Sequence, residues 1–180
     1  MSLSPLIALF MTNSEYGQAN VILAVAQQLA LDRRFTIHIA SPPDLKPRVA
    51  AINKNGELSS SIIFHSIPIL AMAEFAKRQG ISMPHSPGIP GAIASYTTLN
   101  NSIFGWENSE YMSGYYACLS ILNTLKPAAL VLDPGLWMAN DAARALGLKY
   151  VVLTPSSAKE MAGNKLPKGA MFGNTLCKEA

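Results

Sequence analysis

Short apolar runs alternate with amphipathic stretches along most of the chain. Pro5–Thr12 is a continuous apolar run that ends at the polar residues 13–15, which is typical of a strand buried on both faces. Apolar side chains at helical spacing follow it and predict a helix over Gln18–Leu31. The first unit is therefore a strand, a sharp turn and a helix.

The same kind of unit recurs along the chain. The pattern predicts, in order, the strand Phe35–Ala40, a helix opened by Ser41, Pro42 and Pro43 and running to about Asn55, the strand Ile62–Ile67, the helices Leu70–Gln79 and Tyr111–Leu125, the strand Ala128–Leu132, the helix Leu136–Leu146 and the strand Tyr150–Thr154. Gly56, Gly80 and Gly147 stand where helices should end. This order predicts an α/β fold, a Rossmann-like open parallel sheet with right-handed crossovers and helices on both faces.

Two segments interrupt this pattern. Residues 81–91 (ISMPHSPGIPG) contain three prolines and two glycines, which predicts an irregular surface loop. Residues 163–180 show no convincing strand and several turn residues. We therefore expect one domain over residues 1–162 and a divergent tail over residues 163–180.

Composition and charge narrow the range of partners. With 180 residues, 49% of them hydrophobic, the chain can bury one sizeable core. The net charge of +3 is scattered, so we expect no nucleic-acid partner. Cys118 and Cys177 match no disulfide framework or metal spacing, and the apolar stretch Leu6–Met11 is too short to span a bilayer. We expect a cytoplasmic protein without a signal peptide or transmembrane segment.

Candidate functional residues follow the strands, because ligands of open α/β sheets gather at the carboxyl ends. The first turn lacks the glycines of a dinucleotide-binding loop, since only Gly17 is present, and no phosphate-binding loop of the Walker A type occurs. Composition alone favours a plain turn capped by Asn13 or Ser14. Asp133, directly after an apolar strand, could orient a base or bind a hydroxyl at the rim of the cleft, or could cap the next helix.

Histidines and aromatic residues give weaker signals. His38 and His65 lie in predicted strands, which favours a hydrogen-bonded ring packed against a helix over a catalytic role. His85 lies in the proline-rich loop and could reach a ligand, although solvent exposure is the favoured interpretation. Trp106 and the nearby tyrosines Tyr111, Tyr115 and Tyr116 could line an apolar pocket, although covering the sheet is again favoured. No histidine pair has metal-ligand spacing, so no metal is expected.

Four segments together resemble a known family. They are LIALFMTNSEYGQANVILAVAQQLA, FTIHIASPP, IIFHSIP and ALVLDPGLWMANDAARALGLKYVVLTPS. In order and spacing they resemble the N-terminal half of the family 1 glycosyltransferases, the UDP-sugar-dependent enzymes of the GT-B fold, especially their fungal members. The resemblance covers Leu6–Ala162.

The resemblance implies an activity and a set of site residues. It implies transfer of a hexose from a UDP-sugar to a hydroxyl of a small apolar or lipid acceptor, which the N-terminal half binds. In the family a histidine after the first strand deprotonates that hydroxyl, and an aspartate after a later strand orients the histidine. Asp133 stands at the aspartate position, whereas Gln18 stands at the histidine position. Glutamine has no titratable nitrogen and cannot act as a general base.

Further expectations concern binding and completeness. We expect acceptor binding by Asn13, Glu15, Tyr16, Gly17, His85 and Trp106. The UDP-sugar is expected to bind only with a C-terminal domain or a partner chain that carries the donor half, so the isolated chain should need no cofactor and be inactive. The alternative hypothesis is a non-catalytic module that binds a small molecule or a partner. A flavodoxin-like nucleotide-binding domain is disfavoured because a phosphate loop is lacking.

Overall fold

The computed structural model describes residues 4–55, 57–78, 80, 88–91, 93–94 and 105–155. Five parallel strands form one sheet in the order β3-β2-β1-β4-β5. They are β1 (Leu6–Met11), β2 (Phe35–Ser41), β3 (Ile63–Ser66), β4 (Ala129–Leu132) and β5 (Val151–Val152). The predicted open parallel sheet is confirmed, with β1 at its centre.

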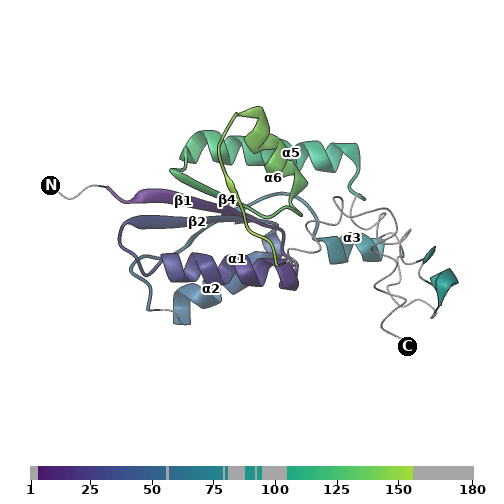
Figure 1. Ribbon diagram of the computed structural model, residues 1–180, viewed down its shortest axis with the longest axis horizontal. Helices are drawn as coiled ribbons and strands as arrows, with labels where there is room; N and C mark the ends of the chain where they lie inside the picture. Colours follow the sequence, from purple (N-terminus) through teal and green to yellow (C-terminus); the bar gives the residue numbers. More distant parts are fainter. Residues whose placement is uncertain are drawn as a thin grey trace, which may run out of the picture.

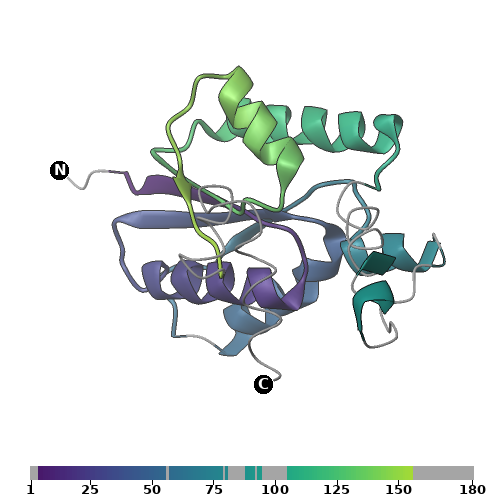
Figure 2. The same ribbon diagram turned by 45° about the vertical axis from the view of Figure 1, so that its right-hand side comes forward.

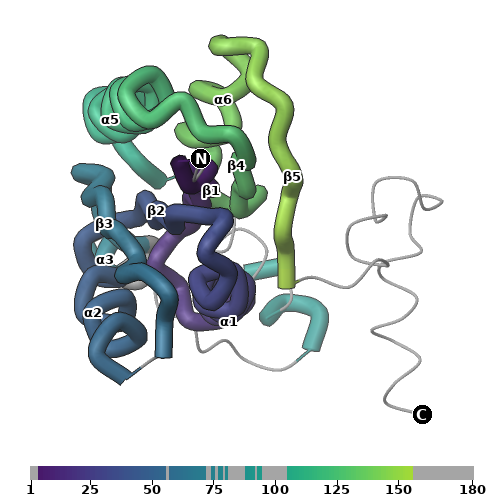
Figure 3. Tube along the Cα trace, turned by 90° about the vertical axis from the view of Figure 1, so that its left-hand side faces the viewer, coloured from purple at the N-terminus to yellow at the C-terminus, as the bar shows by residue number. Residues whose placement is uncertain are grey.

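Helices cover both faces of this sheet (Figure 1). The helices α1 (Tyr16–Leu29) and α2 (Lys46–Asn55) lie on one face, and α5 (Asn108–Leu125) and α6 (Trp137–Ala145) lie on the other. The view along the strands in Figure 3 separates the three layers. The short helix α3 (Met72–Arg78) lies beyond the carboxyl ends of the strands, as Figure 2 shows.

Alternating side chains of the central strand supply two separate cores. Leu9 and Met11 belong to the core beneath α5 and α6, whereas Ala8 and Phe10 belong to the core beneath α1 and α2. All four are 2% exposed or less. Burial on both faces explains why β1 reads as a continuous apolar run in the sequence.

The element boundaries differ from the predicted ones by a few residues. Helix α1 begins at Tyr16 instead of Gln18, and β5 shrinks to two residues. The predicted helix after β2 is divided into a 3₁₀ turn, Pro43–Leu45, and the α-helix α2, which begins at Lys46. Pro47 explains this division, because a residue without an N–H fits only the first turn of an α-helix.

Glycines end two helical segments as expected. Gly80 and Gly147 both have a φ of +63°, a left-handed conformation that side chains disfavour. The N–H of Gly80 donates to the carbonyl of Lys77, and the N–H of Gly147 donates to that of Arg144. None of the helices in the described ranges is long and apolar enough to cross a membrane.

Candidate functional site

Strand register brings the loops after β1 and β4 together. Met11 at the end of β1 pairs with Leu132 at the end of β4. The N–H of Asp133 extends the ladder by donating to the carbonyl of Met11 over 2.9 Å. Thr12 and Asn13 therefore lie opposite Asp133, although they are 120 or more positions away in sequence.

The Asp133 carboxylate joins these two loops. It is 1% exposed, and its Oδ2 accepts hydrogen bonds from Thr12 Oγ1 at 3.0 Å and from the N–H of Asn13 at 3.2 Å. Its Oδ1 accepts from the N–H of Gly135 at 2.7 Å. Both oxygens are thus occupied within the protein. The N-cap position of α6 is Leu136, so Asp133 forms a turn ahead of that helix and does not cap it.

Asn13 connects this carboxylate to Gln18. Its Oδ1 accepts from the N–H of Glu15 at 3.0 Å, and its Nδ2 donates to Gln18 Oε1. Because a backbone N–H can only donate, the Asn13 oxygen must face Glu15 and its amino group must face Gln18. In the part of the chain that the structure describes, no hydrogen bond joins Asp133 directly to Gln18. Asn13 is the link between them.

The orientation of Asn13 determines which atom Gln18 presents. With Oε1 engaged, the Gln18 Nε2 is left as the outward donor, and it has no hydrogen-bond partner among the described residues. Some polar atoms of the described residues are unpaired and enclosed, but Gln18 Nε2 is not one of these, so it reaches solvent. An accessible amide donor therefore stands at the carboxyl edge of the sheet.

Gly135 allows the two amides to lie against the β4 loop. A Cβ atom at this position would lie 3.0 Å from Asn13 Nδ2 and 3.1 Å from Gln18 Nε2. Such distances are tighter than ordinary side-chain contacts, so any larger residue would push the amides away. We call Asn13, Gln18, Asp133 and Gly135 the β1–β4 junction.

The structure places other expected residues elsewhere. Tyr16 is 73% exposed, and the Arg48 guanidinium of α2 lies 4.4 Å from the centre of its ring. The half-buried Trp106 donates from Nε1 to the carbonyl of Leu70 at 3.3 Å and lies 6.5 Å from the Phe75 ring in α3. These contacts direct Tyr16 towards α2 and Trp106 towards α3.

Three further residues were expected to bind the acceptor: Gly17, Glu15 and His85. Gly17 is the second residue of α1, and a Cβ atom there would meet open space. Glu15 precedes α1 as its N-cap residue and joins the junction through its N–H. His85 lies outside the described residues. Of the sequence-predicted site, the structure brings together Asn13, Glu15, Gln18 and Asp133.

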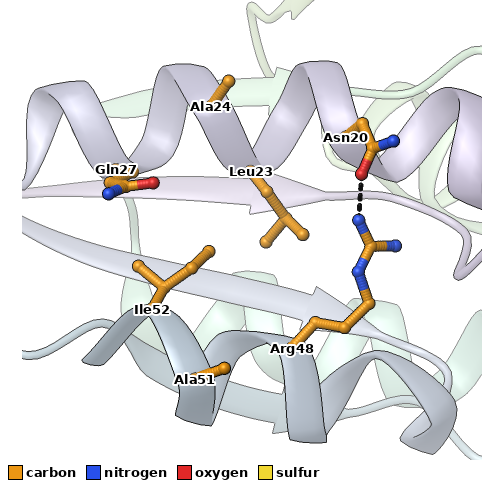
Figure 4. A pocket seen from close by; sticks show the side chains of 7 residues that line it. All are labelled: Asn20, Leu23, Ala24, Gln27, Arg48, Ala51 and Ile52. Carbon is orange, nitrogen blue, oxygen red and sulfur yellow. Dashed lines mark hydrogen bonds between the residues drawn. The ribbon is translucent and has the colours of Figure 1, made fainter. Parts of the chain in front are cut away.

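A groove of 470 Å³ lies between α1 and α2. Leu23 and Ile52 form its apolar floor, and Arg48 reaches across one end to donate to Asn20 (Figure 4). The groove is lined by these two helices only, with no residue of the β4 loop. It is therefore separate from the junction.

His38 and His65 form a pair that the sequence did not indicate. His38 Nδ1 lies 2.8 Å from His65 Nε2, and the rings stack with centroids 5.1 Å apart. Burial lowers the pKa of both imidazoles, and the neighbouring His65 lowers the pKa of His38 further. The predicted hydrogen bonding of each ring is found, with the other histidine as its partner across the β2–β3 pair.

Sequence reasoning missed two residues that donate to Asp133, which are Thr12 and the junction residue Gly135. Each lies within two positions of a polar residue that directly follows a buried strand. That position is a usable signal, but it does not say which two loops meet. Among the residues described, no group of three or more histidine, cysteine or acidic side chains could hold a metal ion.

Comparison with known proteins finds similarity between this chain and glycosyltransferases. No protein-family model matches the chain. A glycosyltransferase of Sordaria araneosa, sdnJ, is 33% identical over 165 residues, which is 84% of this chain and 32% of that protein. The chain thus spans about a third of the length of this relative.

Solved structures share the fold at low sequence identity. The Streptomyces sp. SF2575 glycosyltransferase SsfS6 superposes with a TM-score of 0.53 at 16% identity, over 82% of this chain and 38% of that one. The calicheamicin glycosyltransferase CalG4 gives 0.53 at 17%, over 91% and 38%. TcCGT1, solved in complex with UDP, gives 0.54 at 14%, over 98% and 33%. The chain is thus similar in sequence to a glycosyltransferase, and its parallel sheet has the fold of one part of the GT-B glycosyltransferases.

Proposed function

We propose that this chain is the acceptor-binding part of a nucleotide-sugar glycosyltransferase. The β1–β4 junction would bind a small apolar or lipid acceptor, and an oxygen of that acceptor would receive a hexose from a UDP-sugar. The observation that carries the proposal is the hydrogen-bonded chain from Asp133 through Asn13 to Gln18 at the carboxyl edge of the sheet. In open α/β sheets this edge is where ligands bind.

The geometry suggests a role for each junction residue. Gln18 would contact the acceptor oxygen, because its Nε2 is accessible and has no partner among the described residues. Asn13 would position Gln18, and Asp133 would hold the two loops in register. The carboxylate acts through other residues in this proposal, since both of its oxygens already accept hydrogen bonds within the protein.

Donor binding is assigned to another polypeptide segment. The chain spans 32% of its Sordaria relative, which leaves most of that protein's length unmatched. We propose that a donor domain or a partner chain supplies the UDP-sugar site, with residues 1–162 as the acceptor domain and residues 163–180 outside it. Transfer would be a direct displacement at the anomeric carbon.

Nuclear magnetic resonance on the ¹⁵N-labelled chain tests acceptor binding. Titration with a panel of small apolar alcohols and acids should shift the side-chain amide signals of Asn13 and Gln18, assigned through Asn13→Ser and Gln18→Leu variants. UDP-glucose alone should give no saturable shift. Saturable UDP-glucose binding, or apolar ligands that shift only residues of the α1–α2 groove, would contradict the proposal.

A chimera tests transfer itself. This chain replaces the 165 matching residues of the Sordaria relative, and transfer of labelled hexose from UDP-hexoses to the same panel is measured. Product formation that falls in the Asp133→Ala chimera supports the proposal. A folded chimera that binds an apolar ligand but yields no product supports a second candidate, a non-catalytic binding module. Gln18 favours that candidate because its side chain has no titratable nitrogen.

A further inference from the structure

The accessible amide of Gln18 specifies the polarity of its ligand. Oε1 is held by Asn13, whose own orientation is fixed by the N–H of Glu15. Nε2 therefore offers two N–H donors and no acceptor at the surface of the junction. A ligand atom that satisfies this position must itself be a hydrogen-bond acceptor.

Among the described residues, the junction carboxylate and the imidazoles are already engaged within the protein. Asp133 is 1% exposed and accepts three hydrogen bonds, so its oxygens are already occupied. His38 and His65, the described imidazoles, hydrogen-bond to each other between β2 and β3. Glu15 joins the junction through its N–H, which donates to Asn13 Oδ1, and this residue has a further interaction of its own. The surroundings of Gln18 suit an oxygen that arrives already ionised.

We propose that the acceptor bound at the β1–β4 junction carries a carboxylate. This inference rests on the proposed function and replaces the hydroxyl that the family resemblance implies. A carboxylate oxygen accepts from the Gln18 amide in a charge-assisted hydrogen bond, which is stronger than the bond to a neutral hydroxyl. It also needs no general base, because it has lost its proton before it binds at neutral pH.

With a carboxylate acceptor, the transfer step needs no proton transfer. One carboxylate oxygen of the acceptor attacks the anomeric carbon of a nucleoside diphosphate sugar with its own lone pair and forms a carbon–oxygen bond. The bond from the anomeric carbon to the diphosphate oxygen breaks, and the nucleoside diphosphate leaves with that electron pair. The product is a glycosyl ester, and one negative charge passes from the carboxylate to the diphosphate.

Matched acids and alcohols separate the two kinds of acceptor. Binding of 4-phenylbutanoate is compared with that of 4-phenylbutan-1-ol, and octanoate with octan-1-ol, by calorimetry on the full chain. The signals of Asn13 and Gln18 locate the bound probe. We expect each acid to bind about tenfold or more tightly than its alcohol, as expected for a hydrogen bond to a charged group. Equal affinities, or tighter binding of the alcohols, overturn the proposal.

A charge placed at Gln18 gives the sharper comparison. Gln18→Glu puts a carboxylate against the ligand carboxylate and should remove the preference for acids. Gln27→Glu, the same change at an exposed position of α1 in the α1–α2 groove, should preserve it. A preference for acids that survives in Gln18→Glu, or that disappears in Gln27→Glu, overturns the assignment to Gln18.

The outcomes also separate this inference from the proposed function. Alcohols that bind at the junction as tightly as the acids overturn the proposal of a carboxylate acceptor, but they leave the proposal of acceptor binding intact. Probes that bind away from Asn13 and Gln18, or not at all, overturn both. Thermal unfolding of each variant is recorded first, and Gln18→Leu, which cannot repel a carboxylate, should likewise abolish the preference if Gln18→Glu fails to fold.

Discussion

Two polar sites on the sheet differ in how completely their hydrogen bonds are satisfied. At the β1–β4 junction, three donors from two loops converge on the Asp133 carboxylate. Between β2 and β3, His38 and His65 share one hydrogen bond between their rings. The hydrogen bonds of the junction come from backbone and side-chain donors that keep their protons. The hydrogen bond of the histidine pair requires one of the two facing ring nitrogens to be unprotonated. We therefore expect the first to position a ligand, as proposed above, and the second to couple stability to pH.

Removal of the Asp133 carboxylate should have the largest effect. Asp133→Ala leaves the buried Thr12 Oγ1, the buried N–H of Asn13 and the half-buried N–H of Gly135 without an acceptor. At about 1–3 kcal/mol for each unsatisfied group, the free energy of unfolding should fall by about 3 kcal/mol or more. Urea denaturation measures this change. Asp44→Ala, at an exposed position, is the control and should change it by less than about 0.5 kcal/mol.

Acid should weaken the histidine pair. Both folded-state pKa values are lowered, so the unfolded chain binds protons more readily and stability falls as pH drops below about 6.5. Each proton taken up on unfolding contributes a slope of about 1.4 kcal/mol per pH unit. Urea unfolding at several pH values should show a flatter profile for His65→Gln than for the natural chain. An unchanged profile would mean that the pair does not titrate with folding.

A methyl group at Gly135 tests the junction without removing a hydrogen bond. In Gly135→Ala the new Cβ would approach the amides of Asn13 and Gln18, while the N–H of residue 135 can still donate to Asp133. We expect a loss of about 1 kcal/mol in stability, as for mild overpacking. Ligand binding at the junction should be weakened as well, because Nε2 is displaced. Binding that persists at full affinity would show that Gln18 does not contact the ligand.

Gly17→Ala is the matched change outside the junction and should have the smallest effect. A Cβ atom here meets open space, and the residue lies inside α1. The substitution should raise stability by about 0.5–1 kcal/mol, because alanine loses less backbone entropy than glycine in a helix. Acceptor binding should not change. Reduced binding in this variant would extend the site along α1 beyond the junction.

The helical and strand character of most segments could be predicted from local patterns. The runs around β1 and β4 have the continuous apolar character of strands buried on both faces, and Gly80 and Gly147 ended helical segments as expected. Boundaries were less predictable, because turns such as Pro43–Leu45 compete with the helix that follows. Asn13, Gln18 and Asp133 were identified as candidates, but their mutual contacts were not.

The sequence by itself determined the α/β class, the parallel direction of the strands and the positions where polar residues follow buried strands. Tertiary structure alone decided which of those positions meet. Pairing of β1 with β4 set Asp133 against Thr12 and Asn13, and pairing of β2 with β3 set His38 beside His65. The physical reason is that hydrophobic periodicity reports which side of an element is buried, whereas strand order depends on contacts between residues far apart in sequence.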